Sequence, residues 1–405
     1  MSVSIYQAIQ LISKNSFTFT NRSEIIPIEE SLGRVNYKTL YASLALPPFD
    51  NSAMDGYAIS SQNDSYEIVD KALAGNSSTA SLKDHESIKV ATGAKLPQNT
   101  QSVIPQEDVT IVKNKIIPKK EIKTSSNIRY KGEDIDIGEV IINSKEQITS
   151  ATIALLASQG ITHIEVFQKP RIAIFASGSE LKLHYENLED SQIYNSNTPY
   201  LFSRCIELGC SVTFLGSVKD DLKSIRNLIS NTIDRYDLII TSGGVSVGEA
   251  DFTKEAFNSF GFETIFEKVA IKPGKPTTFG KINNSFILNL PGNPLALSLN
   301  FEIFGKFLIN KLKNLKTPYH SYIETKISKK FIKNKKVDTV IPGFFDGNFF
   351  HVAKKFSPGM VNVLNHCNGF IIISKDKECI KENEIVKFLP IEWGFYTQKF
   401  KEFIT

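Results

Sequence analysis

The chain of 405 residues is poor in the side chains that build metal centres and disulfide frameworks. It has four cysteines and six scattered histidines, and no two cysteines stand in a CxxC spacing. This pattern excludes a zinc ribbon and a disulfide-stapled scaffold. It is typical of a protein with reduced thiols, so we expect a cytoplasmic location.

Long apolar runs and a strong net charge are also missing. No apolar run approaches the 18 residues that a membrane helix needs, and the N-terminus lacks the basic-then-apolar pattern of a signal peptide. The net charge is only +4 for 405 residues. A net charge this small gives no evidence that the protein binds nucleic acid. We therefore expect neither a membrane nor a nucleic acid as a partner.

Arginine is absent from the chain after Arg235. An anion bound by the later residues must therefore be held by lysine and backbone N–H groups rather than by a bidentate guanidinium. Lys268, Lys272 and Lys275 surround one Pro-Gly-Pro turn and would supply the positive charge. A single lysine usually lies on the surface in contact with solvent alone. Three lysines around one turn less often have no other role.

The most informative stretch is residues 237–251, where a short apolar run leads into a glycine-rich loop. A helical pattern follows at residues 252–260. Such a junction aims free backbone N–H groups at a ligand, and the helix dipole there favours an anion. Glu249 and Asp251 would stand beside that anion, which usually indicates a bridging divalent metal. The small and hydroxyl-bearing residues of the junction are Ser242, Gly243, Gly244, Ser246 and Gly248.

Two common phosphate motifs do not fit this loop. Walker A requires a lysine after its last glycine, where this chain has Glu249. The dinucleotide fingerprint requires a glycine where Val245 stands. An ordinary tight turn remains the alternative, although three glycines, two serines and two acids favour a binding loop.

After Lys169-Pro170 the pattern becomes alternating strand and helix, which predicts a doubly wound α/β unit. Nearly every predicted strand of this unit ends in a polar cluster. Ligands of doubly wound sheets bind at the carboxyl ends of the strands. The candidate residues at these ends are Ser177, Gly178, Glu180, Asn195, Ser196, Asp220, Pro291, Asn293 and Pro294.

Three polar loops accompany a β-rich block at residues 60–128. They contain Asp55, Thr92 and Asp134. Asp50, Asn51 and Asp55 could face a substrate or a metal, or they belong to a polar surface turn; the sequence leaves both open. Glu133 and Asp134, just before the chain leaves the β-rich block, could line a cleft between domains. Residues 315–405 return to a β pattern in which no site stands out.

Taken together, these motifs resemble the molybdopterin molybdotransferase family, which includes the C-terminal domain of gephyrin. The resemblance covers nearly the whole chain, most strongly residues 1–310. It is carried by the segments PPFDNSAMDGYAI, ATGAKLP, YKGEDI, SGSEL, YNSN, SGGVSVGEADF, IKPGKP and LPGNP, in the family's order.

The resemblance implies a multidomain α/β plus β fold in an elongated homodimer. The implied parts are a composite N-terminal domain (1–43 and 136–168), an inserted β-rich domain (44–135), a molybdopterin-binding α/β domain (169–314) and a C-terminal β barrel (315–405). The implied reaction inserts molybdate into adenylylated molybdopterin with release of AMP, assisted by Mg²⁺. Transient contact with a molybdopterin adenylyltransferase is also implied.

The resemblance also implies roles for individual residues. Gly243, Gly244, Ser246 and Gly248 would cradle the pterin phosphate, while Lys268, Lys272 and Lys275 would bind phosphate or molybdate. Residues 291–294 would shape the pocket wall. The implied catalytic residues of the α/β domain, which would hold the metal or orient the ligand, are Glu180, Asp220 and Asp251. Those implied to face the pocket from the other subunit are Asp55, Thr92 and Asp134.

The chain departs from the family pattern in its last part. Residues 331–353 lack the arginine that members often have, and Ser357 matches only loosely. Two alternatives stay open: a molybdopterin adenylyltransferase-like enzyme, which would not need residues 1–168, and a non-catalytic pterin-binding scaffold. The sequence does not distinguish molybdate from tungstate.

Overall fold

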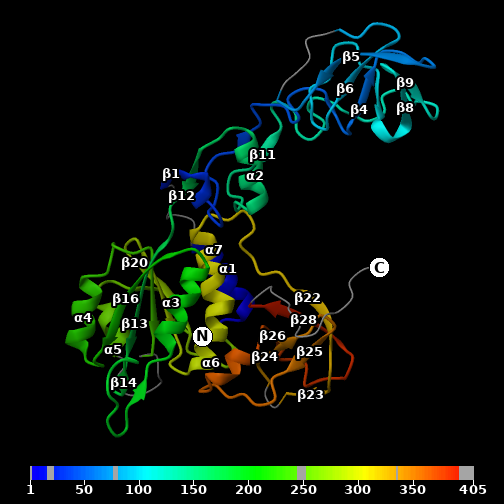
Figure 1. Cartoon of the computed structure of the whole chain (residues 1–405). Helices are drawn as coiled ribbons and strands as arrows, with labels where there is room; N and C mark the ends of the chain where they lie inside the picture. The colour runs from blue at the N-terminus through cyan, green and yellow to red at the C-terminus, as the bar shows by residue number, and fades with distance from the viewer. Residues whose placement is uncertain (1, 16–21, 76–80, 244–251, 334–335, 392–405) are drawn as a thin grey trace.

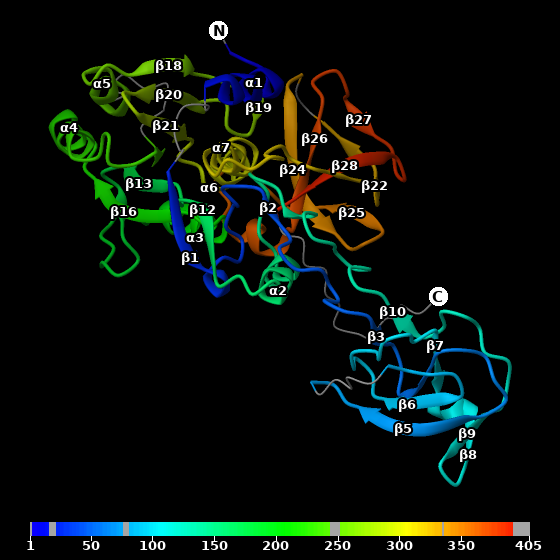
Figure 2. The ribbon, with the colours of Figure 1, turned by 90° about the horizontal axis from the view of Figure 1, so that it is seen from above.

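The computed structural model describes residues 2–15, 22–75, 81–243, 252–333 and 336–391. One β part stands apart at the end of a narrow connection, and the remaining parts gather at the other end (Figures 1 and 2). The expected combination of a composite N-terminal part, an inserted β part, an α/β part and a barrel is confirmed. Among the described helices, none is both long and apolar enough to cross a membrane.

The composite part is closed by two segments that are far apart in the sequence. Strand β1 (Ser23–Pro27) pairs with β12 (His163–Phe167), and β2 (Leu40–Tyr41) pairs with β11 (Val140–Ile142). Their apolar side chains share one core with η1 (Ile28–Glu30) and α2 (Ser150–Ser158). Thr149 caps α2 with its hydroxyl, which satisfies a free N–H of the first turn.

The first helix lies outside this composite core. Helix α1 (Ile5–Asn15) buries Ile5, Ala8 and Ile12, as their helical spacing predicts. These side chains join the large core of the α/β part, where α1 contacts α7 (Lys306–Leu312). The start of the predicted range 1–43 therefore contributes to the α/β core.

The inserted part is a six-stranded sheet in the order β7-β4-β6-β5-β9-β8. Outside it, β3 (Asn51–Ser52) pairs with β10 (Ile128–Arg129) where the chain enters and leaves. The sheet strands and the short helix η2 are β4 (Gly56–Ile59), β5 (Tyr66–Ala72), β6 (Glu86–Val90), β7 (Ser102–Pro105), η2 (Gln106–Asp108), β8 (Val109–Val112) and β9 (Lys115–Pro118).

The α/β part has a mixed sheet in the order β16-β13-β17-β21-β20-β18. Its first four strands are parallel, and β20 and β18 form an antiparallel edge. Helix α3 (Asn197–Glu207) covers one face, and α4 (Leu222–Ser230) and α5 (Phe252–Asn258) cover the other. The strands are β13 (Arg171–Ser177), β16 (Ser211–Val218), β17 (Leu238–Ser242), β18 (Glu263–Phe266), β20 (Thr278–Ile282) and β21 (Ser285–Leu290).

One continuous helix fills the space between this sheet and the barrel. It consists of α6 (Pro294–Asn300), η3 (Phe301–Gly305) and α7, and η3 is a π-helical turn. Glu302 of this turn is only 2% exposed. Arg204 compensates its charge with two hydrogen bonds, Nε to Oε1 at 2.8 Å and Nη2 to Oε2 at 3.0 Å.

Replacing Arg204 by methionine should lower the free energy of unfolding by about 3 kcal/mol, because the buried Glu302 then keeps only the hydroxyl of Tyr200 at 3.1 Å and the ammonium of Lys306 at 4.0 Å. Denaturant unfolding measures this loss. The double variant Arg204→Met/Glu302→Gln removes both charges and should recover most of it. Equal destabilisation by the single and double variants would show that the ion pair is not the cause.

The C-terminal part is a closed barrel. Strands β24, β25, β22, β28 and β26 follow one another, and β26 pairs back with β24. Strand β19 (Ile271–Lys272) leaves the α/β part to pair with β24. Residues 263–272 are thus divided between two sheets, with β18 in the α/β sheet and β19 in the barrel sheet. The elements of this part are β22 (Ile323–Ile327), β23 (Phe331–Ile332), β24 (Asp338–Phe345), β25 (Phe349–Val352), η4 (Asn362–His366), β26 (Gly369–Ile373), β27 (Cys379–Ile380) and β28 (Ile385–Pro390).

Candidate functional site

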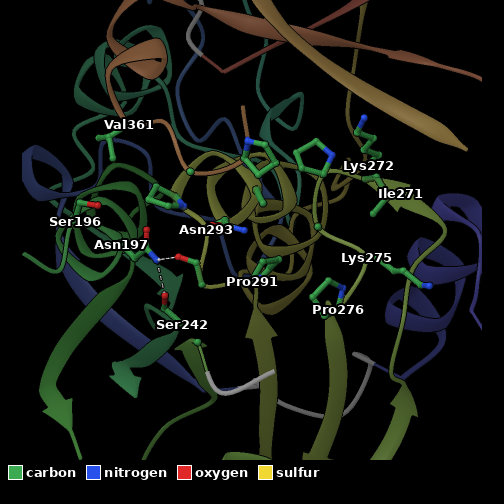
Figure 3. Close-up of a pocket in the computed structure, with 18 of the residues that line it drawn as sticks. Ser196, Asn197, Ser242, Ile271, Lys272, Lys275, Pro276, Pro291, Asn293 and Val361 are labelled. Carbon is green, nitrogen blue, oxygen red and sulfur yellow. Dashed lines mark hydrogen bonds between the residues drawn. The ribbon is translucent and has the colours of Figure 1, made fainter. Parts of the chain in front are cut away.

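A cavity of about 1170 Å³ lies at the carboxyl ends of β13, β17 and β21. The described residues at and just after these strand ends line it, and the turn at residues 273–276 forms one side (Figure 3). The predicted site residues that line it are Ser177, Glu180, Asn195, Ser196, Ser242, Gly243, Lys272, Lys275, Pro291, Asn293 and Pro294.

Asn197 connects three of the loops around the cavity. Its Nδ2 donates to Ser242 Oγ and to the carbonyl oxygen of Gly292, both at 2.7 Å (Figure 3). Asn195 and Ser196 were predicted as site residues from the sequence but Asn197 was not, although it completes the YNSN segment. Asn195 is buried and holds the backbone: its Oδ1 accepts from Thr198 N at 3.1 Å.

The start of the loop after β17 requires glycine. Gly243 has a φ of +87°, and a Cβ there would lie 2.7 Å from the carbonyl oxygen of Ser177. The two strand ends therefore approach closely only because residue 243 has no side chain. Gly244, Ser246, Gly248 and Asp251, also predicted for this site, lie outside the described residues.

Glu180 lines the cavity, whereas the predicted residue Asp220 does not line it but is close enough to Glu180 for their charges to interact. Burial raises the pKa of Asp220, and the negative charges of Glu180 and Asp221 raise it further. The Oδ1 of Asp220 is buried and has no hydrogen-bond partner among the described residues. A buried carboxylate oxygen without a donor, next to a second carboxylate, fits the oxygen ligands that Mg²⁺ prefers. The described ranges contain no group of three or more such ligands, and Asp251 is not among them.

Two of the three predicted lysines line the cavity. Lys272 and Lys275 line the cavity and are exposed (Figure 3). Lys268 is exposed but is not among the lining residues, and its carbonyl oxygen accepts from Val3 N at 2.9 Å. Gly178 is also not a lining residue; its N–H donates to the carbonyl oxygen of Val218 at 3.5 Å.

The barrel contributes to the cavity wall, which the sequence analysis did not predict. Val337, Pro358, Gly359 and Val361 line it. The carbonyl oxygen of Pro358 accepts from Leu295 N at 2.9 Å, so this loop is joined to the first turn of α6. No local sequence signal distinguishes these residues from an ordinary surface loop.

Asp55 and Thr92 adjoin strands β4 and β6 of the inserted β part, and Asp134 follows β10 where the chain leaves it. The inserted part lies far from the α/β part, which bears the cavity (Figures 1 and 2). Asp55 Oδ1 accepts from Thr92 N at 2.7 Å and from Thr92 Oγ1 at 3.0 Å. These bonds lower the pKa of Asp55. Asp134 is exposed, and its backbone N–H donates to the carbonyl oxygen of Leu46 at 2.9 Å.

Two family profiles match most of the chain. The MoeA N-terminal region (domain I and II) matches residues 3–160. A probable molybdopterin binding domain matches residues 173–311.

The chain is also similar to curated proteins over its whole length. It is 35% identical over 394 residues to a molybdopterin molybdenumtransferase from Haemophilus influenzae, covering 92% of this chain and 95% of that protein. It is 29% identical to a Staphylococcus epidermidis protein of the same name, covering 98% of this chain and 97% of the relative.

Solved structures of MoeA proteins have the same fold as this chain. The molybdopterin biosynthesis MoeA protein from Pyrococcus horikosii superposes with a TM-score of 0.81 at 27% identity, covering 97% of this chain and all of that one. A second structure, of the MoeA protein from Pyrococcus horikoshii OT3, supports the fold with a TM-score of 0.85 at 23% identity, covering 96% of this chain and all of the other. The chain therefore belongs to the molybdopterin molybdenumtransferase family.

Proposed function

We propose that this protein inserts molybdate into adenylylated molybdopterin, releasing AMP and yielding molybdenum cofactor. The supporting observation is one cavity lined by a glycine-bearing strand end, two lysines and the carboxylate Glu180, whose charge acts on Asp220. Family membership supports the same reaction. A phosphate-linked pterin and an oxyanion need this combination, because both carry negative charge that must be held close together.

The polar and glycine residues that line the cavity have proposed tasks. Ser242 and Gly243, with Gly244, Ser246 and Gly248 beyond the described residues, hold a phosphate of the substrate. Lys272 and Lys275 attract the oxyanion or phosphate as flexible point charges, with Lys268 nearby in the sequence. The rigid segment 291–294 shapes the wall at the start of α6.

Glu180 and Asp220, together with Asp251, are the residues that would hold Mg²⁺. When bound, the ion supplies charge neutralisation at a pyrophosphate undergoing cleavage. The chain's own contribution is to keep two carboxylates close and one of them partly buried. This arrangement is unfavourable without a cation, because like charges repel.

We further propose that the enzyme is a cytoplasmic homodimer with composite active sites. The exposed residues Asp55, Thr92 and Asp134 would then face the cavity of the other subunit. Transient contact with a molybdopterin adenylyltransferase would deliver the adenylylated pterin directly.

The proposal is tested by mixing purified protein with adenylylated molybdopterin, Mg²⁺ and molybdate and following AMP. We expect AMP release that depends on molybdate and forms active cofactor. Formation of adenylylated pterin from ATP would instead indicate an adenylyltransferase. Tight pterin binding without AMP release would indicate a scaffold.

Asn197→Ala should raise the KM for the adenylylated substrate about tenfold, because it removes two hydrogen bonds that hold the loops of Ser242 and Gly292 together. Steady-state kinetics of AMP release measure the effect. Asn231→Ala is the matched control, since Asn231 donates to its own helix at Asn227 and does not line the cavity. An unchanged KM in Asn197→Ala would exclude the connecting role.

A further inference from the structure

One wall of the cavity is apolar and aromatic and has no task in the proposed chemistry. It is formed by residues 181–194, here called the arm, which project from the α/β part (Figure 1). The arm begins with β14 (Leu181–Lys182) and ends with β15 (Ile193–Tyr194). Leu181, Ile193 and Tyr194 line the cavity. Ile193 is 57% exposed and Tyr194 is 47% exposed. Large apolar side chains left open inside a cavity favour contact with a ligand.

The ring of Tyr194 is held in place by its own arm. Tyr194 is paired with Lys182, and the next residue, Asn195, donates its N–H to the carbonyl oxygen of Lys182 at 2.8 Å. The hydroxyl of Tyr194 donates to the carbonyl oxygen of Glu186 at 3.1 Å. Because the hydroxyl is already used, the ring offers the cavity its aromatic surface rather than a hydrogen bond.

The position of this ring suits a ligand whose phosphate is bound at Ser242 and Gly243, where β17 meets its loop. Tyr194 precedes Asn197 by three residues, which span at most about 11 Å of chain. Asn197 is hydrogen-bonded to Ser242 at that loop. A flat ring attached to the bound phosphate through a sugar or a short carbon bridge is therefore within reach of Tyr194.

We propose that Tyr194 is a stacking platform for a flat nitrogen heterocycle of the substrate, with Ile193 as its apolar border. The inference rests on the proposed function, whose substrate has two such heterocycles, adenine and pterin. Stacking on an aromatic side chain strengthens binding of a base by about tenfold to a hundredfold. Tyr194 is thus a positioning residue that selects ligands with a ring.

The test measures affinity by titration calorimetry for AMP, for molybdopterin, and for ribose 5-phosphate, which lacks a ring system. Tyr194→Ala should lower the affinity for AMP, for molybdopterin or for both by about tenfold or more. The affinity for ribose 5-phosphate should not change. Tyr194→Phe should bind like the wild type. Tyr185→Ala is the matched control, because Tyr185 lies on the same arm, is 73% exposed and does not line the cavity.

If Tyr194→Ala loses affinity for AMP alone, Tyr194 stacks on adenine. If it loses affinity for molybdopterin alone, Tyr194 stacks on the pterin. Equal affinities of Tyr194→Ala and wild type for both ligands, or absence of their binding to the wild type, would overturn the proposal. A comparable loss for ribose 5-phosphate would do the same, since it would indicate a collapsed arm. Ring-dependent binding without molybdate-dependent AMP release would contradict only the proposed enzyme function.

Discussion

Asp220→Asn is expected to reduce molybdate-dependent AMP release by about a hundredfold or more, because a metal at a cleaved pyrophosphate supplies several kcal/mol of charge stabilisation. Asp220 and Glu180 are the described carboxylates that would hold it. The substitution keeps the shape of the side chain but removes its charge. Initial rates at saturating molybdate measure the loss.

The same substitution should leave the protein folded. Burial and the charges of Glu180 and Asp221 raise the pKa of Asp220, so the folded chain binds this proton more tightly than the unfolded chain does. At a pH above that raised pKa, the charge of Asp220 therefore destabilises the folded state. This destabilisation decreases as the pH falls through the raised pKa and Asp220 becomes protonated. Asparagine removes the unfavourable charge, so the thermal midpoint at neutral pH should stay the same or rise.

Asp221 offers a control one residue away. Its Oδ1 accepts from Ser224 N at 2.8 Å and its Oδ2 accepts from Ser224 Oγ at 2.7 Å, which caps helix α4. Asparagine caps helices as well as aspartate does. Asp221→Asn should therefore keep nearly full activity. Binding of Mn²⁺, followed by electron paramagnetic resonance, should weaken in Asp220→Asn but not in Asp221→Asn. Equal activity and equal Mn²⁺ binding in the two variants would exclude Asp220 as a metal ligand.

The α/β part was largely predictable because its signals are local. The alternating pattern predicted after Lys169-Pro170 is present, with strands such as β16 (Ser211–Val218) and β21 (Ser285–Leu290). The predicted polar clusters follow these strands, with Asp220 after β16 and Asn293 after β21. Because parallel strands place their carboxyl ends at one edge of a sheet, this local pattern also indicated where a cavity would form.

Other features depend on contacts that no local pattern reveals. Strand β20 was not predicted, since Gly280 and Lys281 weaken its apolar pattern. The structure shows why glycine is needed: a Cβ at Gly280 would lie 2.4 Å from the carbonyl oxygen of Glu263 and 2.5 Å from the ring of Phe262. The contribution of Pro358 and Gly359 to the cavity likewise arises from the docking of the barrel against α6.

Asp55→Asn and Asp220→Asn are each expected to be inactive alone and to restore activity when they form mixed dimers. In a composite dimer, one site of the mixed species combines the intact Asp220 of the first chain with the intact Asp55 of the second. Random pairing makes half of the dimers mixed, each with one intact site, so about a quarter of wild-type activity should return. Coexpression with two affinity tags allows the mixed species to be isolated and its AMP release measured.

Asp55→Asn should not unfold the inserted β part, because the amide oxygen of asparagine can still accept both hydrogen bonds from Thr92. The control is the chain carrying both substitutions, which should restore nothing when paired with either single variant. Full activity of Asp55→Asn alone would remove Asp55 from the chemistry. An inactive mixed dimer would show that the two carboxylates do not meet across a subunit interface, since separate chains can complement each other only if one site draws on both.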